Sequence, residues 1–249
     1  MFEALLKRIS ISKYKNNIII KGGFLLSSIL GIDERSTMDM DVTIKEITLE
    51  KEILEKIIKE IIIINIGDDI KYKVFSIKDI RLENKYPGYR IHLLAFLDDL
   101  KTHLLIDVTT GDVITIKEID YKYKCVFDNE QIDIMTYNLE TIIAEKFETI
   151  ITRNITNSRM KDFYDIYMLV TVKWNEINEK ILVRALQNTF CNRNSNLYYK
   201  NSNDYIYLIN NSNELKYAWE EYQKRNPYAQ KVSFEDTIKS INKINELIK

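Results

Sequence analysis

The chain has 249 residues, of which 45% are hydrophobic and 29% charged, and its net charge is −1. These values describe a soluble globular protein with one large core or two modest ones, and they argue against a strongly basic, sequence-blind nucleic-acid binder. Cys125 and Cys191 have no CxxC spacing, which excludes a disulfide framework and favours a cytoplasmic location. The longest apolar run, 57–66, includes Lys59 and Glu60 and is too short and too charged to span a membrane.

The first part of the chain mixes helical and extended patterns. An amphipathic helix is predicted at 2–15, a short strand at 18–20, and a helix at 24–30 that Gly31 ends as a C-terminal cap. A further helix is predicted at 49–64 with Thr48 as its N-cap. Alternating apolar residues then predict strands at 38–44, 72–82, 90–96, 103–109 and 121–127.

From residue 138 onward the pattern is helical. Helices are predicted at 139–153, 159–172 and 175–190, followed by a polar loop at 191–204 and further helices within 205–224 and 233–248. The sequence therefore predicts an α+β protein, with an N-terminal mixed sheet with flanking helices followed by a C-terminal helical bundle. We place the boundary near 128–138, which gives domains at 1–130 and 131–249.

The stretch KGGFLLSSILGIDERSTMDMD, residues 21–41, combines two features that suit phosphate chemistry. Gly22 and Gly23 lack a Cβ, so backbone N–H groups can approach a phosphate, and the helix that follows points its positive end at the same anion. Asp39 and Asp41 share one face of the predicted strand, where a divalent cation such as Mg²⁺ would offset their repulsion. The alternative interpretation is a plain turn followed by a solvated strand end.

A third carboxylate, Asp107, lies mid-strand in HLLIDVTTGD among apolar neighbours. An unpaired charge there would be costly, so Asp107 is the candidate that completes a two-metal site with Asp39 and Asp41. The order of glycine pair, helix, two aspartates and later strand aspartate is far more specific than any one of these motifs. His92 and His103 have no metal-ligand spacing and are interpreted as packed or edge histidines, although His103 would share a face with Asp107.

In this order the motifs resemble the polymerase-beta-like minimal nucleotidyltransferases and, within them, the AbiEii/AbiGii-type toxin family with its MenT-related branch. The resemblance covers residues 18–170. It is carried by the glycine pair, by the ending Arg35, Thr37, Asp39, Asp41, and by the segments LLIDVTTGD, LETIIAEKFETIITR and NSRMKDFYDIYML.

The resemblance implies a Mg²⁺-dependent enzyme that moves a nucleotide from an NTP to an RNA acceptor, which is tRNA for some relatives. It also implies a toxin–antitoxin pair acting in phage defence by abortive infection, with an antitoxin encoded nearby that need not contact the toxin. The metal ligands would be Asp39, Asp41 and Asp107. The nucleotide-binding residues would be Lys21, Gly22, Gly23, Arg35, Thr37 and Lys146.

Three residues of the predicted helical half complete the candidate site. On pattern alone, Lys146 could extend to solvent or contact a triphosphate, and the resemblance favours the second role. Asp162 and Asp165 are three residues apart and so share a helix face. The resemblance implies that one of the two is required for activity, by orienting Lys146 or the base, without choosing between them.

Further expectations for the helical half concern packing and RNA. Glu145 is predicted to pair with Arg159 or Lys161. A local patch of Arg153, Arg159 and Lys161 is the basic group available there for RNA. Ordinary packing is favoured over base stacking for four tyrosines, Tyr198, Tyr199, Tyr205 and Tyr207.

Two alternatives keep the fold and change the function. In the first, the nucleotide is transferred to a protein hydroxyl or to a small molecule. In the second, the protein is a non-catalytic nucleotide-binding module, against which the intact trio of Asp39, Asp41 and Asp107 argues.

Overall fold

A computed structural model describes residues 1–31, 39–80, 87–126 and 130–248. Of the described residues, 54% are helical and 22% are in strands, which confirms the predicted α+β class. Contacts within the chain define two compact units: unit 1 contains Met1–Asp112 and Glu118–Tyr137, and unit 2 contains Val113–Lys117 and Asn138–Lys249. The domain limits expected from the sequence stay a prediction.

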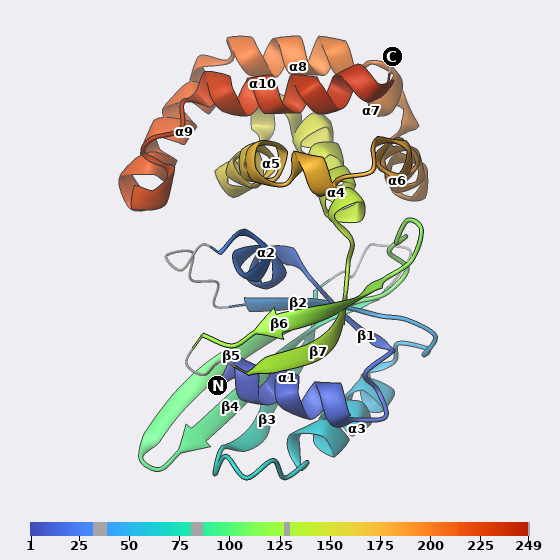
Figure 1. Ribbon diagram of the computed structural model, residues 1–249, viewed down its shortest axis with the longest axis vertical. Helices are drawn as coiled ribbons and strands as arrows, with labels where there is room; N and C mark the ends of the chain where they lie inside the picture. Colours follow the sequence, from blue (N-terminus) through green and yellow to red (C-terminus); the bar gives the residue numbers. More distant parts are fainter. Residues whose placement is uncertain (32–38, 81–86, 127–129, 249) are drawn as a thin grey trace. The chain divides into compact units, whose positions relative to one another are not determined.

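Unit 1 is built on a seven-stranded mixed sheet with the order β3-β4-β5-β2-β1-β7-β6 (Figure 1). Strand β2 runs parallel to β5 and β1 runs parallel to β7, whereas the other neighbouring pairs are antiparallel. The strands are β1 (Ile18–Lys21), β2 (Asp39–Ile44), β3 (Lys71–Asp79), β4 (Gly88–Leu97), β5 (Leu100–Thr109), β6 (Ile119–Lys124) and β7 (Gln131–Thr136).

The helices α1 (Phe2–Ile11) and α3 (Lys51–Ile62) lie on one side of this sheet, and α2 (Gly22–Leu30) lies on the other (Figure 1). Met40 on β2 and Ile106 on β5 are buried in the apolar core that also contains Leu54 of α3. Because side chains alternate along a strand, the neighbouring Asp41 and Asp107 point to the opposite face. The core side of the sheet thus fixes which face carries the candidate site.

Several local expectations for unit 1 need correction. The N-cap of α3 is Glu50 rather than Thr48, and strand β7 was not predicted because its segment was assigned to the domain boundary. Along β7, Ile132 and Ile134 are buried, and the strand lies beside β1 in the sheet. Gly31 follows α2 in the left-handed region with φ 65°, which confirms the predicted cap.

Unit 2 is helical (Figure 1). Asn138 caps the first of its long helices, where its side chain accepts a hydrogen bond from the Thr141 N–H, and Asn178 caps another in the same way. The helices are α4 (Leu139–Arg153), α5 (Met160–Val172), α6 (Glu179–Asn192), α7 (Asn196–Lys200), α8 (Ser202–Asn211), α9 (Asn213–Arg225) and α10 (Phe234–Asn245). Short 3-10 turns occur at Asn154–Thr156, Trp174–Glu176, Pro227–Ala229 and Glu246–Ile248.

The predicted loop at 191–204 is wrong, because it contains α7 and the start of α8. Its composition is polar, and yet Tyr199 packs on Phe190 with ring centroids 5.3 Å apart. Tyr198 stacks on Tyr205 at 4.9 Å. These contacts hold the helices against their neighbours. The segment has no amphipathic pattern long enough to predict a helix from the sequence.

A separate segment, Val113–Lys117, also belongs to unit 2. Its Thr115 carbonyl accepts hydrogen bonds from the Asn138 amide and the Thr141 hydroxyl. The Thr115 N–H donates to the Thr141 hydroxyl over 3.0 Å, and the Thr115 hydroxyl accepts from Asn188 over 2.9 Å. The segment is therefore tied to both α4 and α6.

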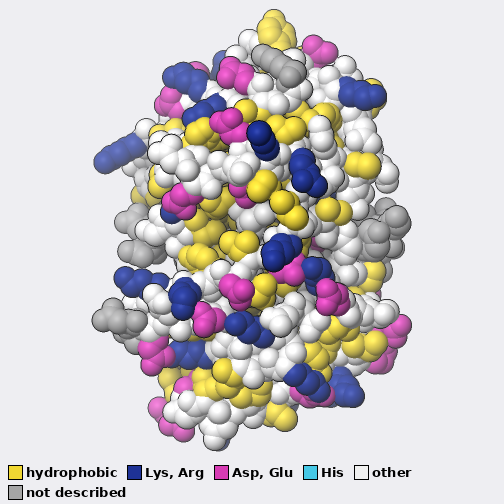
Figure 2. Space-filling model, turned by 45° about the vertical axis from the view of Figure 1, so that its right-hand side comes forward, with side chains coloured by type: hydrophobic (Ala, Val, Ile, Leu, Met, Phe, Trp, Pro, Cys, Tyr) yellow, Lys and Arg dark blue, Asp and Glu magenta, His cyan; other side chains and the backbone are white. Residues whose placement is uncertain are grey.

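The molecular surface carries a mixture of charges. On the face drawn in Figure 2, Lys and Arg side chains alternate with Asp and Glu side chains, as the net charge of −1 suggests. None of the helices in the described ranges combines the length and the apolar composition that crossing a bilayer requires.

Candidate active site

A row of four charged residues crosses the centre of the unit 1 sheet. Lys21 on β1 is opposite Asp41 on β2, Asp41 is opposite Asp107 on β5, and Asp107 is opposite Arg90 on β4. Residues directly opposite one another project to the same face of a sheet. Two carboxylates therefore lie side by side between two cations. Asp39, two residues before Asp41, is on the same face of β2.

Gly22 opens helix α2 directly against this row. Its φ is +71°, and a Cβ built on it would overlap the carboxylate of Asp41. Glycine is required here both for the positive φ and for the close approach. The contact also places the Asp41 carboxylate at the N-terminus of α2, where the partial positive charge of the helix stabilises an anion.

Asp107 is held by an ion pair that the sequence interpretation missed. Arg90 donates from Nε and Nη2 to the two oxygens of Asp107, each over 2.7 Å. The hydrogen bonds to Asp107 and the charge of Asp107 raise the pKa of Arg90. The charges of Asp39 and Asp41 raise it further. The signal available in the sequence was a lone arginine on a strand face, but its partner lies 17 residues away and follows only from the strand register.

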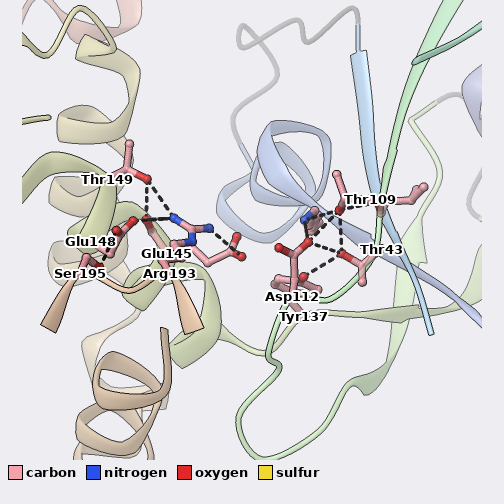
Figure 3. A network of polar contacts seen from close by, with 11 residues as sticks. Thr43, Thr109, Asp112, Tyr137, Glu145, Glu148, Thr149, Arg193 and Ser195 are labelled. Atoms are coloured by element: carbon pink, nitrogen blue, oxygen red, sulfur yellow. Dashed lines mark hydrogen bonds and ion pairs between the residues drawn. The ribbon is translucent and has the colours of Figure 1, made fainter. Parts of the chain in front are cut away.

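A buried network at the end of the same row contains Thr43, Thr109, Asp112 and Tyr137 (Figure 3), and Lys21 contacts it. The Lys21 ammonium group forms an ion pair with Asp112 and donates to the Thr109 hydroxyl over 2.9 Å. The hydroxyls of Thr109 and Thr43 also donate to Asp112, over 2.7 and 3.1 Å, and the Tyr137 hydroxyl is 2.8 Å from that of Thr43. In this arrangement the ammonium group of Lys21 is paired with Asp112. The sequence interpretation did not single out Asp112.

The carboxylates suit a hard divalent cation by their chemistry and by their register. Carboxylate oxygens are the ligands that Mg²⁺ prefers, and neighbouring strands are about 4.8 Å apart, so Asp41 and Asp107 are within reach of a common ion. Within the described residues, no three or more His, Cys, Asp or Glu side chains are already gathered around a metal position. The Asp107 oxygens face Arg90 instead. Arg35 and Thr37 lie outside the described residues.

The predicted residues of unit 2 form one compact cluster. The Lys146 ammonium is 2.8 Å from an oxygen of Asp162 and 2.6 Å from an oxygen of Asp165, and Arg159 lies 2.9 Å from the other oxygen of Asp162. The side chains of the two aspartates are 2% and 0% exposed, and that of Lys146 is 12% exposed. The prediction that Asp162 and Asp165 share a helix face is confirmed. The alternative in which Lys146 extends to solvent is wrong, because its ammonium contacts both aspartates.

The pKa of Asp162 reflects two opposing influences. Burial, the largest influence, would raise the pKa of this carboxyl, but the charges of Lys146 and Arg159 and the hydrogen bond from Lys146 outweigh it. The pKa of Asp162 therefore lies below its ordinary value. The buried negative charge of this cluster is therefore balanced by cations of the same helical unit.

Glu145 does not pair with Arg159 or Lys161, as the sequence interpretation expected. It lies 3.0 Å from Arg193, at the end of α6, and Arg193 also lies 2.6 Å from the buried Glu148 (Figure 3). Glu148 accepts a further hydrogen bond from the Ser195 hydroxyl over 2.9 Å. The partner of Glu145 is 48 residues away in sequence and depends on how α4 and α6 pack.

Two solved structures share this fold. The crystal structure of JHP933 from Helicobacter pylori has a TM-score of 0.53 and 16% identity, over 99% of this chain and 88% of that chain. A second crystal structure, of a "putative nucleotidyltransferase from H. pylori", has a TM-score of 0.52 and 16% identity, over 99% and 91%. A search among curated proteins found no match. At 16% identity, these two likenesses show a shared fold.

The family follows from the sequence itself. The family model "Nucleotidyl transferase AbiEii toxin, Type IV TA system" matches residues 4–239. The chain belongs to this family of nucleotidyltransferase toxins of type IV toxin–antitoxin systems, as the resemblance implied.

Proposed function

We propose that this toxin is a Mg²⁺-dependent enzyme that transfers a nucleotide from an NTP to the end of an RNA, with tRNA as the first candidate acceptor. The observation that carries the proposal is the row across the sheet, in which Asp41 and Asp107 are opposite each other, with Asp39 on the same face. The contact between Gly22 and Asp41 supports it, because it joins the phosphate-binding turn to the metal ligands.

Each residue of the row has a role in the proposal. Asp39, Asp41 and Asp107 would hold Mg²⁺, which when bound activates the attacking hydroxyl and stabilises the leaving pyrophosphate. Arg90 positions Asp107 through the paired hydrogen bonds. Gly22, which has no Cβ, is proposed to let a phosphate approach the backbone N–H groups at the start of α2. Lys21, Gly23, Arg35 and Thr37 remain proposed nucleotide-binding residues.

Lys146 is proposed to bind the NTP phosphates as a point charge. Asp162 and Asp165 are then positioning residues, because both hold the Lys146 ammonium. The proposal expects Asp165→Asn to raise the KM for the NTP more than it lowers kcat, since a misdirected ammonium weakens phosphate binding. An unchanged KM would remove Asp165 from the nucleotide site.

Transfer of label from an α-labelled NTP tests the metal ligands directly. We expect Asp39→Asn and Asp41→Asn each to lower the rate by roughly a thousandfold and to abolish growth inhibition, because each removes a charged ligand. Asp133→Asn is the matched control, since Asp133 is exposed on β7. Full toxicity of either variant would show that the assignment of the metal ligands is wrong.

The acceptor is tested by offering the wild-type enzyme separate RNA and protein pools with the same labelled NTP. The proposal expects the label in RNA. Label in protein or in a small molecule would favour transfer to another acceptor on the same fold. Tight NTP binding without pyrophosphate release would favour a non-catalytic module.

The chain belongs to a family of type IV toxin–antitoxin toxins, and we propose that it is the toxin of such a pair and acts in the cytoplasm in phage defence, with an antitoxin encoded nearby. Co-expression of the neighbouring gene should restore growth of cells that carry the wild-type toxin. Continued growth inhibition would reject that gene as the antitoxin without affecting the enzymatic assignment.

A further inference from the structure

One face of the strands β3, β4 and β5 is strongly basic. In the register of these strands, Lys71 and Lys101 are both opposite Phe96, and Lys78 is opposite Arg90, so their side chains share the face that carries Asp107. We call this surface the cationic sheet face. Its basic residues, all exposed, are Lys71, Lys73, Lys78, Arg90 and Lys101.

Acidic residues are scarce on the cationic sheet face. Among the positions of the three described strands that project to it, Asp107 is the one acid, and Arg90 pairs with it. The whole chain is nearly neutral, with a net charge of −1. The concentration of cations is therefore a local property of this face, and it makes the face a candidate binding surface for a polyanion.

Three aromatic rings lie among these cations. Phe75 occupies an irregularity in the register of β3 and is 62% exposed, and its ring is 4.8 Å from that of His92. The His92 ring is in turn 4.8 Å from that of His103, with 2.6 Å between the facing nitrogens. The chain has two histidines, and the fold brings both into this group.

The combination of cations and exposed rings suits single-stranded nucleic acid. Lysine and arginine contact phosphates, and flat rings stack on unpaired bases regardless of sequence. The position also suits the proposed chemistry: His103 and Asp107 are on the same face of β5, four residues or about 13 Å apart at the usual rise of a strand. A single-stranded nucleic acid bound along this face would have its end close to the proposed metal ligands.

We propose that the cationic sheet face binds the single-stranded end of the RNA acceptor, with phosphates on its lysines and a base stacked on Phe75 and the histidine pair. This inference rests on the proposed function for the identity of the acceptor. It assigns acceptor recognition to residues outside the metal and nucleotide sites.

Fluorescence anisotropy with a labelled single-stranded RNA of about 12 nucleotides tests the binding without catalysis. We expect the double variant Lys73→Glu/Lys101→Glu to weaken binding by more than about tenfold and to flatten its dependence on salt, because phosphate contacts are lost. Phe75→Ala should weaken binding by roughly 5- to 100-fold, because a stacking ring is lost.

The matched control is Lys56→Glu/Lys124→Glu, at exposed positions on α3 and on β6, the strand at the other edge of the sheet from β3. It changes the net charge equally and should alter affinity by less than about twofold. Unchanged thermal unfolding would establish that all the variants are folded, as expected for exposed side chains.

The outcomes separate this inference from the proposed function. If the double variant and Phe75→Ala bind the RNA as the wild type does, the inference is overturned whether or not label is transferred. If binding depends on these residues but no label reaches RNA, the surface stands and the proposed acceptor chemistry fails. Equal loss of affinity in the Lys56→Glu/Lys124→Glu control would mean that the loss follows from net charge alone, which also overturns the inference.

Discussion

The candidate carboxylates of the two units lie in contrasting surroundings. In unit 1, Asp41 and Asp107 stand half-buried on an open sheet face, and the Asp107–Arg90 pair keeps 17% and 44% of its side chains exposed. In unit 2, Asp162 and Asp165 are buried and are held by Lys146. A charge near water remains inexpensive to keep ionised and available to a ligand, whereas a buried charge must be compensated by the protein itself.

The comparison predicts different consequences for removing a charged residue from each unit. Removing a half-buried carboxylate of unit 1 should harm the proposed activity and leave the fold largely intact. Removing one member of the Lys146 cluster should harm the fold first, because its partners stay buried and charged. Stability measurements can therefore divide the candidate residues before any substrate is known.

The largest effect on stability is expected from Lys146→Met. The change leaves Asp165 buried without the ammonium that holds it, and breaking such a pair typically costs about 3–5 kcal/mol in the free energy of unfolding. Urea unfolding followed by circular dichroism measures the loss. Lys161→Met, at an exposed position on α5, is the control. A loss no greater than that of the control would remove the contrast between the units.

Gly22→Ala is expected to lower the free energy of unfolding by somewhat less, about 2–4 kcal/mol. Alanine is strained at the positive φ of this position, and its Cβ would overlap the Asp41 carboxylate. Gly31→Ala provides a matched comparison, since its φ is +65° but no atom lies within 4 Å of the new Cβ. Backbone strain alone should cost about 1 kcal/mol there. Equal losses in thermal or urea unfolding would mean that contact with Asp41 contributes nothing.

Acid should weaken unit 2 through Asp162. The folded-state pKa of this carboxyl is below its unfolded value, so its contribution to stability is complete above about pH 4 and is lost as the pH falls through the lower folded value. We expect the unfolding free energy of Asp162→Asn to vary less with pH below about pH 4 than that of the wild type. Parallel curves for the two proteins would contradict the lowered pKa.

The smallest effect is expected from Arg90→Met in unit 1. The pair with Asp107 is partly exposed, and such pairs contribute about 0.2–1 kcal/mol to stability. The proposed positioning of Asp107 nevertheless predicts a clear fall in nucleotide transfer by the same variant. A stability loss as large as that of Lys146→Met, measured in the same urea experiment, would erase the distinction between an open and a buried pair.

Much of unit 1 could be predicted because its signals are local. Alternation revealed β4 and β5, and Gly31 marked the end of α2. The order of Asp39, Asp41 and Asp107 indicated neighbouring strands, which the register confirms, whereas their role as ligands stays a prediction. Strand β7 was missed because its exposed polar side chains resembled a linker.

The features that could not be predicted depend on partners distant in sequence. Arg90 reaches Asp107 only through the register of an antiparallel pair, and Glu145 reaches Arg193 only through the packing of α4 on α6. Helix α7 lacks an amphipathic pattern and is instead held by contacts such as that between Tyr199 and Phe190. Pairing information of this kind is not contained in periodicity.

The bonds of Thr115 limit how evolution can recombine this protein. Val113–Lys117 lies in the middle of the chain and yet contributes to the helical unit, where it is bonded to Asn138, Thr141 and Asn188. A single crossover after Tyr137 would give a recombinant whose helical half comes from one parent and this five-residue segment from the other. Exchange of the helical half between relatives should therefore succeed only where both parents keep the same residues at these four positions.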